Sequence, residues 1–236
     1  MSAPVVGEFL GTLILILLGD GVVAAVLLEH SKAKGAGWIV VTAGWAFAVT
    51  CGIFVSKALG GPGALNPVGP LVSLVQGKGG VAEQLTLMAG QFAGAFAGAV
   101  LVWLHYLPHW KVTTDAAVKL GVFCTAPAIR RPLANLFSEM LGTFVLVFVA
   151  SAVVKAELGS AEPAFVGMVV WAIGLSLGAT TGYAINPARD LGPRIAHALL
   201  PIVGKGTSDW GYAWVPVVGP CVGAVLAALL FHTLVK

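Results

Sequence analysis

The dipeptide Asn-Pro occurs twice in this chain, at Asn66-Pro67 and Asn186-Pro187, and each copy lies between two long apolar stretches. Asparagine is a strong helix N-cap and proline is favoured at the first helical position, so each dipeptide predicts the start of a helix. The segments that follow are short, from residue 67 to about 76 and from 187 to about 200. A helix of about ten residues is about 15 Å long, half of a hydrocarbon core of about 30 Å. The pattern therefore predicts two half-helices, which in membrane proteins indicate a solute site near the bilayer midplane.

The composition is that of a membrane protein, with 58% hydrophobic and 10% charged residues. A net charge of +3, spread along the chain, indicates no face for nucleic acid. A spanning helix needs about 17 to 25 residues, and the sequence contains six apolar segments near that length. The expected spans are residues 5–28, 37–55, 83–106, 133–154, 164–182 and 210–234. Because no span is followed by a soluble domain, residues 1–236 are interpreted as one membrane domain.

The chain contains an internal repeat. Residues 8–15 (EFLGTLIL) match residues 139–146 (EMLGTFVL) in pattern and mostly in identity. The two units, about 1–110 and 132–236, each hold three spans and one half-helix, and the long segment 107–132 joins them. Three spans is an odd number, so the second unit is inverted in the membrane and the half-helices meet at their N-termini. Non-helical backbone at that depth is tolerated where it lines a cavity or is buried in protein, and the architecture therefore predicts a pore.

The stretch 182–193, GYAINPARDLGP, is the most specific motif of the chain. With it, and over its whole length, the sequence resembles the major intrinsic proteins, in particular the aquaglyceroporin (glycerol facilitator) branch, of which the aspartate after Asn-Pro-Ala-Arg is a hallmark. The resemblance implies an all-α membrane fold of six transmembrane helices plus two re-entrant half-helices in an inverted repeat. It also implies a homotetramer in the plasma membrane, with both termini in the cytoplasm and the 107–132 loop outside.

The resemblance further implies a narrow outer selectivity filter made of Trp45, Gly174, Tyr183 and Arg189. The glycine leaves width where water-selective relatives are narrowed by a histidine. We expect Trp45 and Tyr183 to form an apolar corner that contacts the carbon atoms of a solute. Arg189 is expected to donate hydrogen bonds to the solute hydroxyls opposite it.

The resemblance places a second constriction at the two Asn-Pro motifs. Its residues are Asn66, Pro67, Val68, Asn186, Pro187 and Ala188. Each asparagine is expected to cap its half-helix with the side-chain oxygen and to present its amide NH2 to a passing oxygen. The two helix N-termini, each equivalent to roughly +0.5 charge, are expected to repel cations and protons together with Arg189. Val68 departs from the usual alanine, which predicts a slightly altered junction.

Three acidic residues are interpreted as structural supports. Glu8 and Glu139 occupy equivalent places in the repeat, which favours a role in accepting hydrogen bonds from re-entrant backbone. Proton relay in a coupled transporter is the alternative for these intramembrane carboxylates. Asp190 is expected to hold the following loop through Arg194. Asp20, between two glycines of the first span, has no repeat partner and receives no role.

The expected function is a passive channel for glycerol and other small uncharged solutes, with water, that excludes ions and protons. The alternative within this class is a facilitator of undissociated lactic acid, other small neutral organic acids or dihydroxyacetone. A secondary transporter and a structural, junction-forming relative are the other classes. No HExxH or GxSxG motif indicates an enzyme, and neither a cofactor nor a metal is expected, since Cys51, Cys124 and Cys221 are spaced as packing residues.

The expected orientation of the chain in the membrane is opposed by the count of Lys and Arg residues on the two sides. With cytoplasmic termini, the inner segments hold four lysines, at positions 57, 78, 155 and 236. The outer segments then hold seven basic residues, at positions 32, 34, 111, 119, 130, 131 and 205. Four against seven runs counter to the positive-inside rule, and here we follow the resemblance.

Overall fold

The computed structural model describes residues 2–235, and the regular structure within that range is entirely helical. Six helical segments are long and apolar enough to cross a membrane. They are α1 (Ala3–Leu27), α2 (Trp38–Ala58), α4 (Val81–His105), α7 (Pro132–Lys155), α8 (Glu162–Ser176, preceded by a 3-10 turn at Gly159–Ala161) and α10 (Val215–Leu234). The predicted all-α, multi-pass membrane fold is confirmed.

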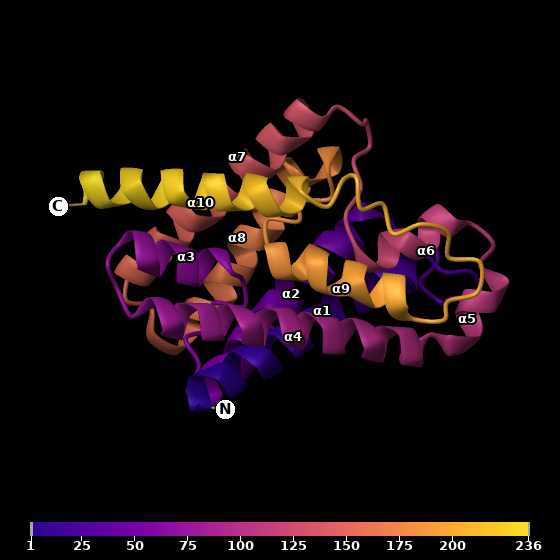
Figure 1. Cartoon of the computed structure of the whole chain (residues 1–236), viewed down its shortest axis with the longest axis horizontal. Coiled ribbons are helices and arrows are strands. Elements are labelled where there is room, and N and C mark those ends of the chain that lie inside the picture. Colours follow the sequence, from indigo (N-terminus) through magenta and orange to yellow (C-terminus); the bar gives the residue numbers. More distant parts are fainter. Residues whose placement is uncertain (1, 236) are drawn as a thin grey trace.

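Two short helices follow the Asn-Pro dipeptides, as predicted. They are α3 (Val68–Val75) and α9 (Pro187–Leu199), and both lie among the long helices in Figure 1. Helix α3 packs against α4 and α10, and α9 packs against the same two helices. Pro187 is the first residue of α9, whereas Pro67, with φ −55° and ψ −22°, precedes the first residue of α3.

Two predicted span boundaries differ from the structure by five residues or more, and one connection contains helices that were not predicted. The sixth span starts at Val215 rather than at residue 210, because the backbone between Asp209 and Val215 forms turns. The fifth ends at Ser176 and continues as a 3-10 turn, Gly178–Thr180. The long 107–132 connection contains α5 (Leu107–Val112) and α6 (Ala116–Phe123), which were not predicted.

Small residues bring the long helices into backbone contact in pairs. A Cβ atom added to Gly94 of α4 would lie 2.2 Å from the Phe9 carbonyl oxygen of α1. In the other half of the chain, a Cβ added to Gly223 of α10 would lie 2.1 Å from the Met140 carbonyl oxygen of α7. Glycine at these positions permits the close helix crossings that small residues provide in membrane proteins.

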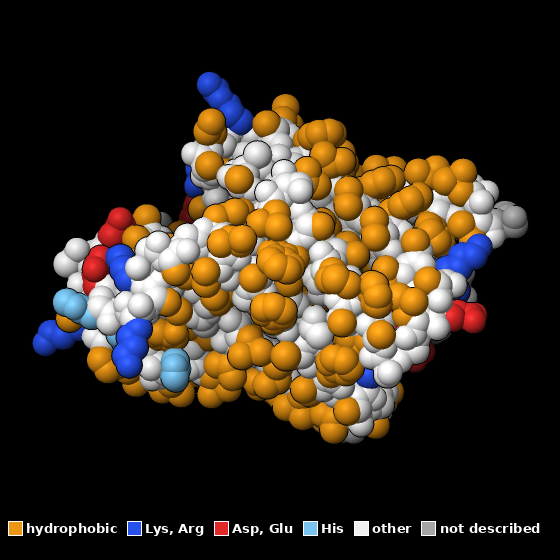
Figure 2. Space-filling view, turned by 180° about the vertical axis from the view of Figure 1, so that it is seen from behind, with side chains coloured by type: hydrophobic (Ala, Val, Ile, Leu, Met, Phe, Trp, Pro, Cys, Tyr) orange, Lys and Arg blue, Asp and Glu red, His pale blue; other side chains and the backbone are white. Residues whose placement is uncertain are grey.

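The molecular surface has an apolar middle and charged ends. In Figure 2, hydrophobic side chains cover the centre, and most of the visible charged side chains gather towards the two ends of the long axis. Both termini lie in the left half of Figure 1, whereas α5 and α6 lie at the right end. This distribution suits a chain that crosses a bilayer along the long axis, with the two termini on the same side.

Candidate functional site

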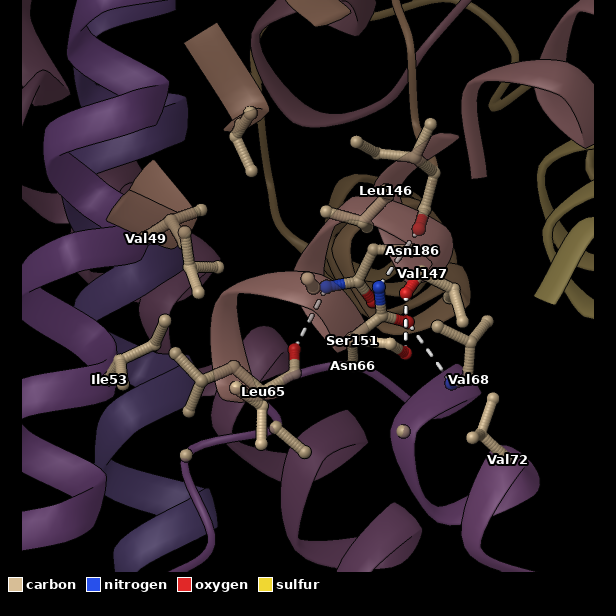
Figure 3. Close-up of a pocket in the computed structure, with 18 of the residues that line it drawn as sticks. Val49, Ile53, Leu65, Asn66, Val68, Val72, Leu146, Val147, Ser151 and Asn186 are labelled. Atoms are coloured by element: carbon tan, nitrogen blue, oxygen red, sulfur yellow. Dashed lines mark hydrogen bonds between the residues drawn. The ribbon is translucent and has the colours of Figure 1, made fainter. Parts of the chain in front are cut away.

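The two asparagine side chains meet where the half-helices begin, and each binds the loop that carries the other (Figure 3). Asn66 Nδ2 donates to the Ile185 carbonyl at 2.9 Å, and Asn186 Nδ2 donates to the Leu65 carbonyl at 2.8 Å. An amide nitrogen carries two N–H groups, so each asparagine has a second donor for another acceptor.

The side-chain oxygens cap the two helices. Asn186 Oδ1 accepts from the backbone N–H of Ala188 at 2.9 Å and of Arg189 at 3.2 Å. Asn66 Oδ1 accepts from the N–H of Val68 at 3.2 Å. These bonds satisfy donors that the first helical turn leaves free, and both positive helix ends point to the same place.

The residue before each asparagine has strained backbone. Leu65 has φ +52° and Ile185 has φ +42°, a region that bulky and β-branched side chains rarely adopt. Such conformations persist only where surrounding contacts hold them.

Two buried carboxylates supply these contacts. Glu8 accepts the backbone N–H of Leu65 at 2.8 Å, and Glu139 accepts that of Ile185 at 2.8 Å. Glu8 also accepts from the backbone of Gly63 and Ala64 and from the side chains of Ser56 and Gln91. Glu139 also accepts the N–H of Ala184 at 3.0 Å. Both re-entrant loops therefore depend on a carboxylate from the first helix of their own half.

Three of the four residues expected in the outer filter line one end of a single cavity, namely Trp45, Tyr183 and Arg189. Gly174 lies behind Tyr183, since an added Cβ would be 2.9 Å from Tyr183 Cζ. Its carbonyl accepts a hydrogen bond from Trp38 Nε1 at 3.0 Å. The glycine thus provides the space in which the tyrosine ring lies.

The guanidinium of Arg189 stacks on one of these aromatic rings. Arg189 Cζ lies over the Trp45 ring, 4.0 Å from the ring centroid. A guanidinium is weakly hydrated and stacks favourably on the indole face. Arg189 Nη1 also reaches the Phe123 carbonyl at 3.3 Å.

Asp20 joins this group, although the sequence assigned it no role. Its Oδ1 lies 3.4 Å from Arg189 Nη1, and both side chains are buried. The one indication in the sequence was a carboxylate inside an apolar span, a position that is costly without a partner.

Asp190 is buried in a network that joins α9 to the segment that follows α6. It binds Arg194 Nε at 2.8 Å and accepts from the backbone N–H and the hydroxyl of Thr125 at 2.8 and 2.7 Å. Arg194 donates in turn to the carbonyls of Ser208 and Thr125. Thus Asp190 and Arg194 form a fully buried ion pair that also binds two backbone segments, one at Thr125 and one at Ser208.

Val68 packs against two of the long helices, α7 and α10. It clusters with Val147 of α7 and with Ala224 and Ala227 of α10, whereas Ala188 belongs to the larger core of the other helices. Two alanines on α10 thus accommodate the additional methyl groups of valine. Val68 also faces the cavity, as Figure 3 shows.

The cavity has a volume of about 700 Å³ and runs from Arg189 past the two asparagines to the end of the molecule that carries the C-terminus. Apolar side chains such as Val49, Ile53 and Leu146 surround the asparagines in Figure 3. At the other end it reaches Lys78, Lys155 and His232. The lining is thus mostly apolar around the asparagines and becomes polar and charged towards the end that carries the C-terminus.

Within residues 2–235, no three His, Cys, Asp or Glu side chains come together in a way that could hold a metal ion. Cys51, Cys124 and Cys221 are all free thiols. The polar groups that the cavity presents between its Arg189 end and the two asparagines include the hydrogen-bond donors of Arg189, Asn66 and Asn186.

Comparison with known proteins gives concordant results over the full chain. The family model described as "Major intrinsic protein" matches residues 1–231. "Glycerol uptake facilitator protein 3" of Lactiplantibacillus plantarum is 56% identical over 235 residues, which cover 99% of this chain and 98% of the relative. The "D/L-lactic acid transporter" of the same organism is 37% identical over 236 residues, covering 98% of each chain. The X-ray structure of the aquaglyceroporin from Plasmodium falciparum superposes with a TM-score of 0.86 at 28% identity, covering 99% of this chain and 96% of that one.

Proposed function

Because the chain belongs to the major intrinsic protein family, we propose that it is a passive membrane channel for glycerol and other small uncharged solutes, with water. The names of its relatives support glycerol as the main solute. The single observation that carries the proposal is the cavity that connects Arg189 with the two cross-bonded asparagines. A channel of this kind performs transport rather than catalysis.

The proposed filter consists of Trp45, Gly174, Tyr183 and Arg189. A polyol has a carbon side and a hydroxyl side, which match an aromatic wall and a guanidinium. Arg189 uses Nη1 for its protein contacts, and its Nε and Nη2 donors make no hydrogen bond to the described residues. These donors are proposed to bind two solute hydroxyls as the solute passes Trp45 and Tyr183.

The proposed second constriction consists of Asn66, Pro67, Val68, Asn186, Pro187 and Ala188. Each asparagine Nδ2 has two N–H groups, and one of them is bonded to the opposite loop. The two remaining N–H groups can donate to a solute oxygen that has left the filter. The positive ends of α3 and α9 oppose entry of cations and of hydronium at this point. Glu8, Glu139 and Asp190 are proposed as the structural supports of these loops.

The chain is a multi-pass membrane protein, and we propose cytoplasmic termini, with residues 1–110 and 132–236 as the repeats and the 107–132 loop outside. Four of the seven basic residues that this orientation places outside have local partners in the structure. Lys34 and Arg130 pair with Glu29 and Asp209. Lys119 and Lys205 bind backbone carbonyls, and burial lowers the pKa of the Lys205 ammonium. Acidic partners contribute little to the positive-inside rule, so the count of basic residues stands and the proposed orientation rests on the family resemblance. A homotetramer with one pore in each subunit is proposed from the family resemblance.

The test is stopped-flow light scattering on proteoliposomes, with glycerol, water and lactic acid below its pKa as separate solutes. Glycerol re-swelling that is faster than in empty liposomes and does not saturate is the expected result. Glycerol flux equal to that of empty liposomes would contradict the proposal. Rapid lactic acid entry in that case would favour the alternative, which the 37% identical lactic acid transporter supports.

Gly174→Ala is expected to lower glycerol permeability about fivefold or more, with a smaller effect on water, since it narrows the filter. The added Cβ would lie 2.9 Å from both Tyr183 Cζ and Thr42 Cγ2, so the tyrosine ring must move. Gly211→Ala is the matched control, because a Cβ there meets nothing within 4 Å. Equal loss of water and glycerol permeability would argue against Gly174 setting the filter width.

A further inference from the structure

Asp20 is a carboxylate in the interior of a helix, where the backbone N–H groups are already used in the bonds of the helix itself. It lies in the interior of α1, and its side chain has no exposed surface. Its Oδ1 faces Arg189 Nη1 at 3.4 Å, and its Oδ2 has no hydrogen-bond partner among the described residues. A buried charge of this kind persists when an opposite charge compensates it. Arg189 is therefore the group placed to compensate a charge on Asp20.

The guanidinium of Arg189 is held from three elements at once. Asp20 of α1 and the Phe123 carbonyl at the end of α6 both contact Nη1, and the Trp45 ring of α2 lies under Cζ. Both polar contacts fall on the same nitrogen, so Asp20 fixes the guanidinium from one side and leaves other donors available. In this geometry the aspartate acts on the solute through Arg189.

The charge of the filter depends on this pair. The N-termini of α3 and α9 already contribute roughly +0.5 charge each. An uncompensated Arg189 would add a full positive charge, at a depth where neither bulk water nor salt screens it well. Such a pore would still repel cations, but it would attract small anions. With Asp20 ionised, the filter itself is close to neutral.

We propose that Asp20 is a specificity-determining residue of the pore: as the counter-ion of Arg189, it keeps the filter neutral and so prevents small inorganic anions from entering. The inference rests on the proposed channel function. It assigns discrimination against anions to a residue on the first helix, outside the four-residue filter, while Arg189 continues to donate hydrogen bonds to neutral solutes.

The test measures nitrate and glycerol permeability of the same proteoliposomes, with a potassium gradient and valinomycin to drive the anion. Asp20→Asn keeps the shape and removes the charge, and it is expected to raise the ratio of nitrate to glycerol permeability about tenfold or more. The ratio does not depend on how much of the protein is active. Asp20→Glu retains the charge and is expected to keep the ratio within about twofold of wild type. Glu29→Gln, which removes one exposed carboxylate just beyond α1, controls for net charge and is expected to leave the ratio unchanged.

Arg189→Val and the double variant Asp20→Asn/Arg189→Val show whether Asp20 acts through Arg189. The proposal expects Asp20→Asn to raise the ratio in the wild-type background and to leave it unchanged in the Arg189→Val background. An equal rise in both backgrounds, or no rise in either, would overturn it. Asp20→Ser is measured in parallel, so that the ratio is available if Asp20→Asn fails to fold. Wild-type glycerol flux equal to empty liposomes would instead contradict the proposed function, which separates the two failures.

Discussion

Replacing Glu8 with glutamine is expected to reduce glycerol flux to the level of empty liposomes and to lower the free energy of unfolding by about 3 kcal/mol or more. Glu8 accepts three backbone N–H groups of the first re-entrant loop, at Gly63, Ala64 and Leu65. A glutamine has one acceptor oxygen, and its NH2 group would face N–H donors that then lack a partner. Leu65 would lose the contact that holds its strained backbone, and the Asn66 side chain would move out of the pore junction. Thermal unfolding in detergent and stopped-flow glycerol flux measure the two effects.

Glu139→Gln provides the comparison. Glu139 accepts only two backbone N–H groups of the second loop, from Ala184 and Ile185, among the described residues. The expected destabilisation is therefore smaller than for Glu8→Gln. An equal or larger fall in melting temperature for Glu139→Gln would contradict this account of the loops. Unchanged flux in Glu8→Gln would show that the first loop holds its conformation without the carboxylate.

Asp190→Ala is expected to destabilise the protein by about 3 to 5 kcal/mol, because it leaves the Arg194 guanidinium as an uncompensated buried charge. Both side chains of this pair are fully buried. The Thr125 N–H and hydroxyl also lose their acceptor, so the segment that follows α6 loses its bonds to Asp190. The melting temperature is the measurement, and increased proteolysis at residues 124–131 is the expected local effect.

Arg130→Gln is the matched control for that prediction. Arg130 forms an ion pair with Asp209 close to the same network, but half of its side chain is exposed. Exposed pairs typically contribute about 0 to 1 kcal/mol, so a small change in melting temperature is expected. If Asp190→Ala lowers the melting temperature no more than Arg130→Gln does, the buried pair is not what holds the loop.

The helical fold was predictable because hydrophobicity and chain length decide it in a membrane. The two half-helices were predictable for a local reason, since asparagine followed by proline is a strong helix start. The predicted start of the sixth span, at residue 210, was wrong. Trp210 and Trp214 are apolar enough to extend a span in the sequence, but the backbone there forms turns. Helix α6 was missed although Asp115 caps it, with Oδ1 accepting from Ala117 N–H at 2.7 Å.

The site was less predictable wherever residues distant in the chain meet. The bond between Asp20 and Arg189 joins positions 169 residues apart, and one sequence contains no pattern that links them. The stacking of Arg189 on Trp45 depends on the path of α2 past α9, which composition and spacing do not determine. The carboxylates of Glu8 and Glu139 were predictable, because they occupy equivalent positions in the internal repeat.

The reciprocal bonds between the asparagines and the opposite loops have a consequence for biosynthesis. Asn66 Nδ2 binds a carbonyl 119 residues further along the chain. At synthesis rates of about 5 to 20 residues per second, that partner leaves the ribosome roughly 6 to 24 seconds after Asn66. During this interval the first half-helix has neither its cross-bond nor α10 against which it packs. The first re-entrant loop therefore reaches its final structure only after the second half of the protein has been made, and the two loops must mature together.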